Sequence, residues 1–194
     1  MATDRSFAQL VSLACHDLRT PLATVHGFAR TIERLEPLQA RTSRYVGLIV
    51  EGSAQIAELL ERLALVSRIE RGSYEPARQT VDSLDLVQAA AALVDAGDVS
   101  VDGKGAPVSI DPVPTEQSIA ALCTCAIRHG DSESLECAVR GADVTIRPIS
   151  EDSAPILLGD ELRDFGAVAA CIHIEALGGS VRIEAQELLV RFSG

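Results

Sequence analysis

A regular spacing of apolar residues near the start of the chain most constrains its fold. Between residues 11 and 35 apolar side chains recur alternately three and four positions apart, with Pro21 filling one gap: Val11, Ala14, Leu18, Val25, Phe28, Ile32 and Leu35. This alternation is the seam of a helix that packs against other helices as in a coiled coil. The segment therefore predicts one long amphipathic helix.

A second helix is predicted after a break at Glu36-Pro37-Leu38-Gln39. Its apolar stripe consists of Tyr45, Ile49, Ile56, Leu59, Leu63 and Val66, with Gly52 at one seam position. Two helices of about 30 residues joined by a short loop form an antiparallel hairpin. One hairpin cannot bury both stripes well, whereas two hairpins can do so in a four-helix bundle. We therefore expect a homodimer.

The hydrophobic period changes within residues 71–76, where Gly72, Ser73 and Pro76 are turn and breaker residues. We place a domain boundary there, giving a helical hairpin over residues 1–72 and a second domain over residues 73–194. In the second domain the pattern predicts helices at 84–94, 117–128 and 164–177, the last ended by Gly178-Gly179. It predicts strands at 99–101, 107–110, 135–139, 144–148, 180–184 and 187–192, with a turn at Gly103-Lys104-Gly105 between the first two. This is an α+β layer, with helices on one face of a mostly antiparallel sheet.

The charge of the chain divides at the same boundary. Residues 1–72 carry 9 basic and 8 acidic side chains, whereas residues 73–194 carry 8 basic and 20 acidic ones, and the whole chain has a net charge of −11. Such acidity argues against nucleic acid or an anionic membrane surface as a partner, because both repel a negative protein. No apolar run approaches the ~20 residues of a membrane span, and the N-terminus lacks the pattern of a signal peptide. We expect a cytoplasmic protein.

The five cysteines, at positions 15, 123, 125, 137 and 171, have no metal-ligand spacing. Cys123 and Cys125 form one close pair, but no second pair follows it. An odd number of such cysteines is typical of reduced thiols in a cytosolic protein. We therefore expect buried small hydrophobic side chains and no metal ligand among them.

The segment that carries chemistry is Cys15-His16-Asp17-Leu18-Arg19-Thr20-Pro21-Leu22. With Val11 at heptad position a, His16 falls at f, the position farthest from the seam. The neighbouring carboxylate of Asp17 can accept a ring proton and make the imidazole a better nucleophile, and Thr20 lies one turn further on the same face. Pro21 removes one backbone donor below the site. A surface histidine beside an aspartate is also common without any function, and we expect structural roles for His26, His129 and His173.

The sequence His16-Asp17-Leu18-Arg19-Thr20-Pro21-Leu22, on the first helix of a predicted antiparallel pair, resembles the H-box of sensor histidine kinases. Proteins of that family join a dimerisation and histidine-phosphotransfer hairpin to an ATP-binding α+β domain. The resemblance implies that His16 is the phospho-acceptor and Asp17 its acid/base partner. It implies that Thr20 positions water in a phosphatase reaction and that Arg19 contacts phosphate or the partner.

The resemblance continues through residues 76–194 as a framework without the binding residues. The two N-box asparagines that hold Mg²⁺ and phosphate in the family correspond to Ala121 and Cys125, and neither suits a hard cation. The glycine-rich segment after the central hairpin, whose aspartate binds the adenine amino group in the family, corresponds to residues 145–154, which contain no glycine. The Gly-x-Gly before the last helix corresponds to Asp164-Phe165-Gly166, and about ten residues (153–162) replace the lid. The resemblance therefore implies a degenerate ATP-binding domain that binds no ATP.

These features predict a histidine phosphotransferase that exchanges a phosphoryl group between His16 and an aspartate of a response-regulator receiver domain. The chain would need no cofactor, because the receiver supplies its own Mg²⁺, and a hybrid kinase would act upstream. We expect no autokinase activity. Two alternatives remain open: a divergent sensor kinase fragment, and a non-enzymatic or phosphatase regulator that binds a response regulator.

Overall fold

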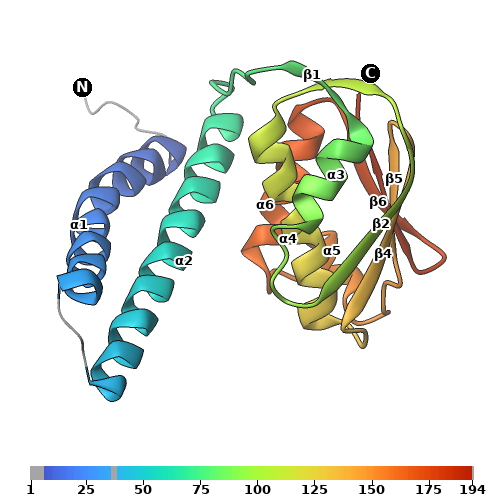
Figure 1. Ribbon diagram of the computed structural model, residues 1–194. Helices are drawn as coiled ribbons and strands as arrows, with labels where there is room; N and C mark the ends of the chain where they lie inside the picture. The colour runs from blue at the N-terminus through green and yellow to red at the C-terminus, as the bar shows by residue number, and fades with distance from the viewer. Residues whose placement is uncertain (1–6, 36–38, 194) are drawn as a thin grey trace, which may run out of the picture. The chain divides into compact units, whose positions relative to one another are not determined.

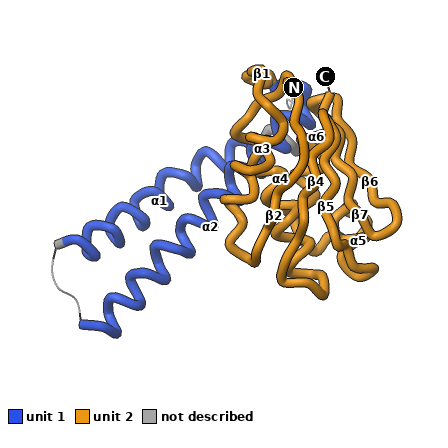
Figure 2. The backbone as a smooth tube through the Cα atoms, turned by 45° about the vertical axis from the view of Figure 1, so that its right-hand side comes forward, with its two compact units in different colours: residues 1–74 blue, residues 75–194 orange. Residues whose placement is uncertain are grey.

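The computed structural model describes residues 7–35 and 39–193. The chain divides into two units, one ending at Tyr74 and one beginning at Glu75 (Figure 2). Most of the loop predicted at residues 36–39 lies outside the described residues, and so does the side chain of Leu35. Among the described residues, no helix has both the length and the apolar character that a bilayer crossing requires.

The first unit is a hairpin of two long helices, α1 (Phe7–Leu35) and α2 (Ala40–Glu70), which lie side by side (Figure 1). The contact between α1 and α2 includes a buried cluster of small side chains, Ala29, Val46 and Val50. His26 Nδ1 lies 2.8 Å from Ser53 Oγ across the two helices. The predicted helical hairpin is confirmed, and α1 continues through Pro21 as one helix.

The second unit contains seven strands and four helices in the part of it that the structure describes (Figure 1). The helices are α3 (Ser83–Ala91), α4 (Pro112–His129), α5 (Ala154–Leu157) and α6 (Phe165–Ala176). The strands are β1 (Gln79–Asp82), β2 (Asp98–Gly105), β3 (Pro107–Ile110), β4 (Ser134–Gly141), β5 (Asp143–Arg147), β6 (Ser180–Glu184) and β7 (Glu187–Arg191).

A five-stranded sheet in the order β2-β4-β5-β7-β6 forms one layer of this unit, and the helices cover one of its faces (Figure 1). Alternate side chains of each strand point into the core, as the period of a strand requires. Those on β4, β5 and β7 are Leu135, Cys137, Val139, Val144, Ile146, Leu188 and Val190. The opposite face carries charged residues, among them Glu136, Arg147 and Glu187. The predicted α+β class is therefore confirmed.

One sequence expectation about this unit is wrong. The segment at Gly103-Lys104-Gly105 is not a turn between two neighbouring strands but the end of β2, which pairs in parallel with β4. The next strand, β3, pairs instead with β1 in a separate two-stranded sheet. Gly103 allows β2 to continue here for two reasons. Its φ is +124°, which other residues rarely adopt, and its backbone lies so close to Val139 that a Cβ would be 2.1 Å from the Val139 carbonyl oxygen.

Candidate functional site

His16 lies on α1 with its imidazole open to solvent, its side chain being 78% exposed. Its Nδ1 lies 3.2 Å from Oδ1 of Asp17, which is itself exposed. A carboxylate accepts a hydrogen bond only from a protonated ring nitrogen, so this contact favours the tautomer with the proton on Nδ1. The lone pair of Nε2 then points away from Asp17 and is available as a nucleophile.

Arg19 and Thr20 are exposed on the same helix as His16. At about 100° per residue, Thr20 lies one turn beyond His16 on the same face. The structure thus presents all four predicted site residues to solvent within two turns of α1.

The apolar stripe predicted as the helix seam is exposed in the single chain. Its exposed members are Leu18, Val25, Phe28 and Ile32 on α1 and Tyr45, Ile49, Ile56 and Leu59 on α2, each at least 46% exposed. Leu48, which was not predicted in the stripe, is also exposed, whereas Leu63 and Val66 of the predicted stripe are half-buried. The α1–α2 contact instead uses a neighbouring face with Cys15 and Ala29. His16 lies nearly opposite the apolar stripe on the helical wheel of α1, so a protein covering the stripe would leave His16 open.

In the second unit, the positions that correspond to the N-box are occupied by apolar side chains in the core. Ala121 and Cys125 are both buried on α4. Burial raises the pKa of the Cys125 thiol to about 12, so this sulfur is neutral at physiological pH. Magnesium ions take oxygen ligands, and neither side chain supplies one. These residues do not fit a Mg²⁺–nucleotide complex.

The start of α6 also differs from a phosphate-binding helix N-terminus. Asp164 is the N-cap of α6, and its Oδ1 accepts a hydrogen bond of 3.0 Å from the backbone nitrogen of Ala167. A helix N-terminus attracts phosphate through free N–H groups and its positive dipole end. Here a carboxylate satisfies one of those groups and supplies a negative charge, which would repel phosphate.

The segment after β5 offers no buried carboxylate for an adenine amino group. Its acidic residues Glu151 and Asp152 are exposed, and the buried Ser153 closes a turn by hydrogen bonds with Ser150. The short helix α5, which sequence reasoning did not anticipate, follows this turn. The segment that replaces the lid is therefore partly helical and ordered around serine hydroxyls.

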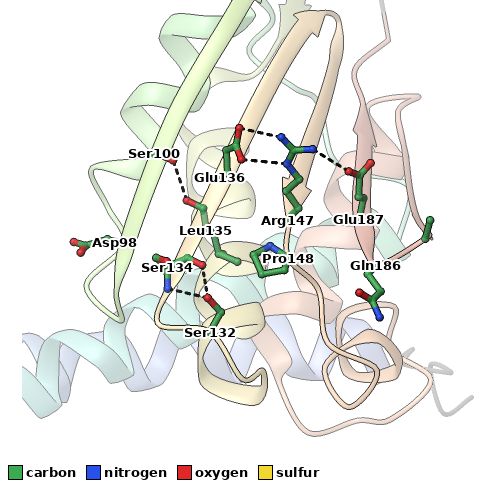
Figure 3. Close-up of a pocket in the computed structure, with 11 residues that line it drawn as sticks. Asp98, Ser100, Ser132, Ser134, Leu135, Glu136, Arg147, Pro148, Gln186 and Glu187 are labelled. Atoms are coloured by element: carbon green, nitrogen blue, oxygen red, sulfur yellow. Dashed lines mark hydrogen bonds and ion pairs between the residues drawn. The ribbon is translucent and has the colours of Figure 1, made fainter.

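One hollow of the second unit lies on the outer face of the sheet (Figure 3). Its central cation, Arg147, binds Glu136 at 3.1 Å and Glu187 at 3.3 Å. Asp98 also lines it. Because two carboxylates already satisfy the guanidinium and the lining is net negative, this hollow is a poor site for a phosphate or a nucleotide.

Sequence reasoning missed one cluster of side chains in the second unit. One ligand atom each from Cys125, His129 and Asp164 lies within 4.8 Å of the other two. The spacing of Cys125 and His129 on a helix places them on one face, and this signal could have been recognised. Asp164 is 35 positions beyond His129, and only the packing of α4 against α6 brings it there.

Comparison with known proteins gives these sites a context. Residues 8–72 match the family model of the His Kinase A (phospho-acceptor) domain. The histidine protein kinase DivJ of Caulobacter vibrioides is 26% identical over 145 residues, which cover 72% of this chain and 24% of DivJ. The chain thus spans about a quarter of the length of that relative.

Solved structures share the fold of both units. Full-length ShkA, crystallised with AMPPNP, has a TM-score of 0.66 at 19% identity, covering 95% of this chain and 45% of ShkA. The ATP-binding domain of PrrB from Mycobacterium tuberculosis has a TM-score of 0.50 at 17% identity, covering 61% of this chain and 98% of that domain. At these identities the likeness concerns the fold alone.

Proposed function

We propose that this chain, which is sensor-histidine-kinase-like in its phospho-acceptor sequence and in its fold, is a histidine phosphotransferase of a two-component phosphorelay. It exchanges a phosphoryl group between His16 and an aspartate of a response-regulator receiver domain. The observation that carries the proposal is the exposed His16 imidazole, with Nδ1 directed to Asp17 and Nε2 left free.

The proposed transfer balances without any cofactor on this chain. The Nε2 lone pair of His16 attacks the phosphorus of the receiver's aspartyl phosphate. The N–P bond forms while the P–O bond to the receiver aspartate breaks, and that aspartate leaves as a carboxylate. The ring gains positive charge in this step, which Asp17 stabilises through its hydrogen bond and by accepting the Nδ1 proton. The reverse reaction passes through the same groups.

The neighbouring residues have supporting roles in this proposal. Arg19 is a donor for phosphoryl oxygens or for a carboxylate of the partner. Thr20 can hold a water molecule on the face of His16, which would permit hydrolysis as a side reaction. Each of these side chains is exposed on α1, so they meet the phosphoryl group only when a receiver docks there.

We also propose that the protein acts as a homodimer and does not draw its phosphoryl group from ATP. The exposed apolar stripe of both helices supports the dimer, because burying it against a second hairpin would complete a four-helix bundle. Two observations support transfer without ATP. The buried side chains of Ala121 and Cys125 supply no oxygen ligand for Mg²⁺, and the Asp164 carboxylate occupies a backbone N–H at the helix terminus where a phosphate would bind.

The test is incubation of the purified chain with phosphorylated receiver domains. We expect label to move from the receiver to the chain, and the His16→Gln variant to accept none. His26→Gln is the matched control, because it removes an imidazole from the same helix at a position bonded to Ser53. Equal transfer by His16→Gln and by the parent would refute the proposal.

A divergent kinase fragment is the second candidate, and the similarity to DivJ across 72% of the chain favours it. That function predicts labelling of His16 from γ-labelled ATP in the absence of any receiver. The phosphotransferase proposal predicts no such labelling, and labelling only after a phosphorylated receiver is added. Labelling from ATP and labelling from a phosphorylated receiver can be measured on the same preparation, and the two candidate functions predict opposite results.

A further inference from the structure

The three side chains at the junction of α4 and α6 form a compact donor set. Cys125 and His129 lie one turn apart near the end of α4, and Asp164 caps the start of α6. Their nearest sulfur, nitrogen and oxygen atoms all lie within 4.8 Å of one another. His129 Nε2 and Asp164 Oδ2 are 3.6 Å apart.

The two oxygens of Asp164 have different surroundings, which orients the carboxylate. Oδ1 accepts the hydrogen bond from the Ala167 nitrogen at 3.0 Å, while Oδ2 faces His129. A second partner of this kind holds metal-ligating carboxylates in position in known metal sites. Asp164 therefore presents one oxygen to the cluster without a rearrangement of α6.

From this arrangement we propose that Cys125, His129 and Asp164 bind a zinc ion. A tetrahedral zinc ion with bonds of about 2.0–2.3 Å needs its ligand atoms roughly 3.3–3.8 Å apart, and small side-chain adjustments bring the observed separations to that range. The three residues supply three ligands. The fourth position is left to solvent, because the side chains of His129 and Asp164 are 29% and 16% exposed.

The chemistry of the donor set selects the class of metal. One thiolate, one imidazole and one carboxylate form a mixed sulfur, nitrogen and oxygen set that suits Zn²⁺, whereas Mg²⁺ and Ca²⁺ take oxygen ligands. Zn²⁺ binding would release the proton of the neutral Cys125 thiol to solvent, and the resulting thiolate and the carboxylate together would balance the two positive charges of the ion. This proposal replaces the sequence-based expectation that the chain holds no metal ligand.

Only one cysteine of the Cys123–Cys125 pair belongs to the cluster. Residues two apart on a helix point about 200° apart, so the two sulfurs cannot share an ion. The Cys123 thiol is hydrogen-bonded to Cys137 of β4, and this bond together with burial raises the pKa of Cys123. The site is therefore built from the i, i+4 spacing of α4, and not from the Cys-x-Cys spacing.

The experiment uses the full chain, stripped of metal with a chelator and titrated with Co²⁺ and then Zn²⁺. We expect one equivalent of Co²⁺ to give the intense visible bands of a tetrahedral site and a near-ultraviolet thiolate charge-transfer band, and Zn²⁺ to abolish both. His129→Gln and Asp164→Asn should each weaken Zn²⁺ binding at least about tenfold, since even a supporting group costs that much in metal sites. Cys125→Ser should remove the charge-transfer band.

The control variants are Cys15→Ser and His26→Gln, which remove the same side-chain types from the helical hairpin and should leave the titration unchanged. His129 and Asp164 are partly exposed, so their variants decide the question even if Cys125→Ser fails to fold. The absence of a one-equivalent cobalt spectrum would overturn the proposal. So would Zn²⁺ binding that His129→Gln and Asp164→Asn leave unchanged, because the ion would then sit elsewhere.

Discussion

At the scale of single residues, Asp17 is the proposed acid/base partner of His16. Its carboxylate lies 3.2 Å from Nδ1 of the ring and would accept the proton that this nitrogen releases. We expect Asp17→Asn to slow transfer from a phosphorylated receiver roughly 10²-fold, the lower range for loss of an acid/base group. Single-turnover kinetics measure this rate. Asp17→Glu should recover part of the rate, and an unchanged rate in Asp17→Asn would contradict the acid/base role.

His173 gives a second prediction at this scale. It is fully buried on α6, with Nδ1 2.9 Å from Ser118 Oγ. Burial lowers its pKa to about 4, against a smaller opposing effect of Asp111. In the unfolded chain, His173 therefore binds a proton as the pH falls below its ordinary pKa of about 6.5. In the folded chain it binds that proton only when the pH falls to about 4. The free energy of unfolding must fall as the pH drops through this window.

The expected loss from this histidine is about 2 kcal/mol between pH 7 and pH 5. Urea denaturation of the parent and of His173→Gln at both pH values measures it, because the other titrating groups cancel in the comparison. The parent should lose about that much more stability than the variant on acidification. Parallel pH dependence in the two proteins would contradict the prediction, because it would show that the pKa of His173 is the same in the folded and the unfolded chain.

Local sequence was enough to predict His16 as a candidate phospho-acceptor, whereas it did not predict the cluster around Cys125. The features of His16 come from adjacent residues: its heptad position, the carboxylate of Asp17 and the proline that follows. The third member of the cluster, Asp164, is distant in sequence and joins it only through the packing of α4 on α6. Sequence spacing reveals a site whose groups share one helix and misses one assembled from two.

At the scale of elements, the apolar stripe on α1 and α2 is the surface with the clearest consequence. Phe28, which is 67% exposed, lies within it. We expect the parent to sediment as a dimer and Phe28→Glu to weaken dimerisation at least about 30-fold, the effect of losing a hot-spot side chain. Leu13→Glu is the matched control, because Leu13 is 55% exposed but lies off the stripe. Equal weakening by both variants would contradict the assignment.

The parallel pairing of β2 with β4 supplies a stability prediction. A Cβ at Gly103 would lie 2.1 Å from the Val139 carbonyl oxygen, and the residue has φ +124°. Gly103→Ala should therefore lower the free energy of unfolding by roughly 2–4 kcal/mol. Gly141→Ala tests backbone strain without a steric clash, because Gly141 also has a positive φ, +64°, but a Cβ there would meet no atom within 4 Å. This substitution should lower the free energy of unfolding by about 1–2 kcal/mol. Urea denaturation compares the two, and equal costs would argue against the clash.

The sequence predicted the type of each element, helix or strand, better than it predicted which strands pair with each other. Alternating apolar residues identified β4, β5, β6 and β7, and the Gly178-Gly179 pair marked the end of α6. The extension of β2 through Gly103 was missed because glycine and aspartate there resemble a turn. Strand pairing depends on contacts between distant segments, and the period of one strand carries no information about them.

At the scale of the whole molecule, the uneven charge is consistent with the proposal that the hairpin docks a receiver domain and the second unit contributes partner selectivity. The hairpin with His16 is nearly neutral, whereas residues 73–194 carry 20 acidic side chains against 8 basic ones. A docking surface near neutrality does not repel the acidic pocket that a receiver must bring to His16. An acidic second unit can favour partners with complementary basic surfaces through the rate of association.

That same charge bears on nucleotide binding, the property that separates a phosphotransferase from a kinase. A nucleotide triphosphate needs compensating cations, yet Lys104 is the single lysine of the chain. The Asp164 carboxylate lies at the helix terminus that would receive the phosphates. We therefore expect millimolar ATP with Mg²⁺ to leave the melting temperature of the full chain unchanged.

Differential scanning fluorimetry with and without Mg²⁺–ATP checks this expectation, and a nucleotide-binding sensor kinase serves as the positive control. Ligand at 100 times its Kd stabilises a protein by about 2.7 kcal/mol, which corresponds to a shift of several degrees. A shift of that size here would contradict transfer without ATP and favour the divergent kinase. Because Cys125 of the proposed zinc site stands at a position that corresponds to the N-box, the scans should use metal-free protein, so that bound zinc does not affect the result.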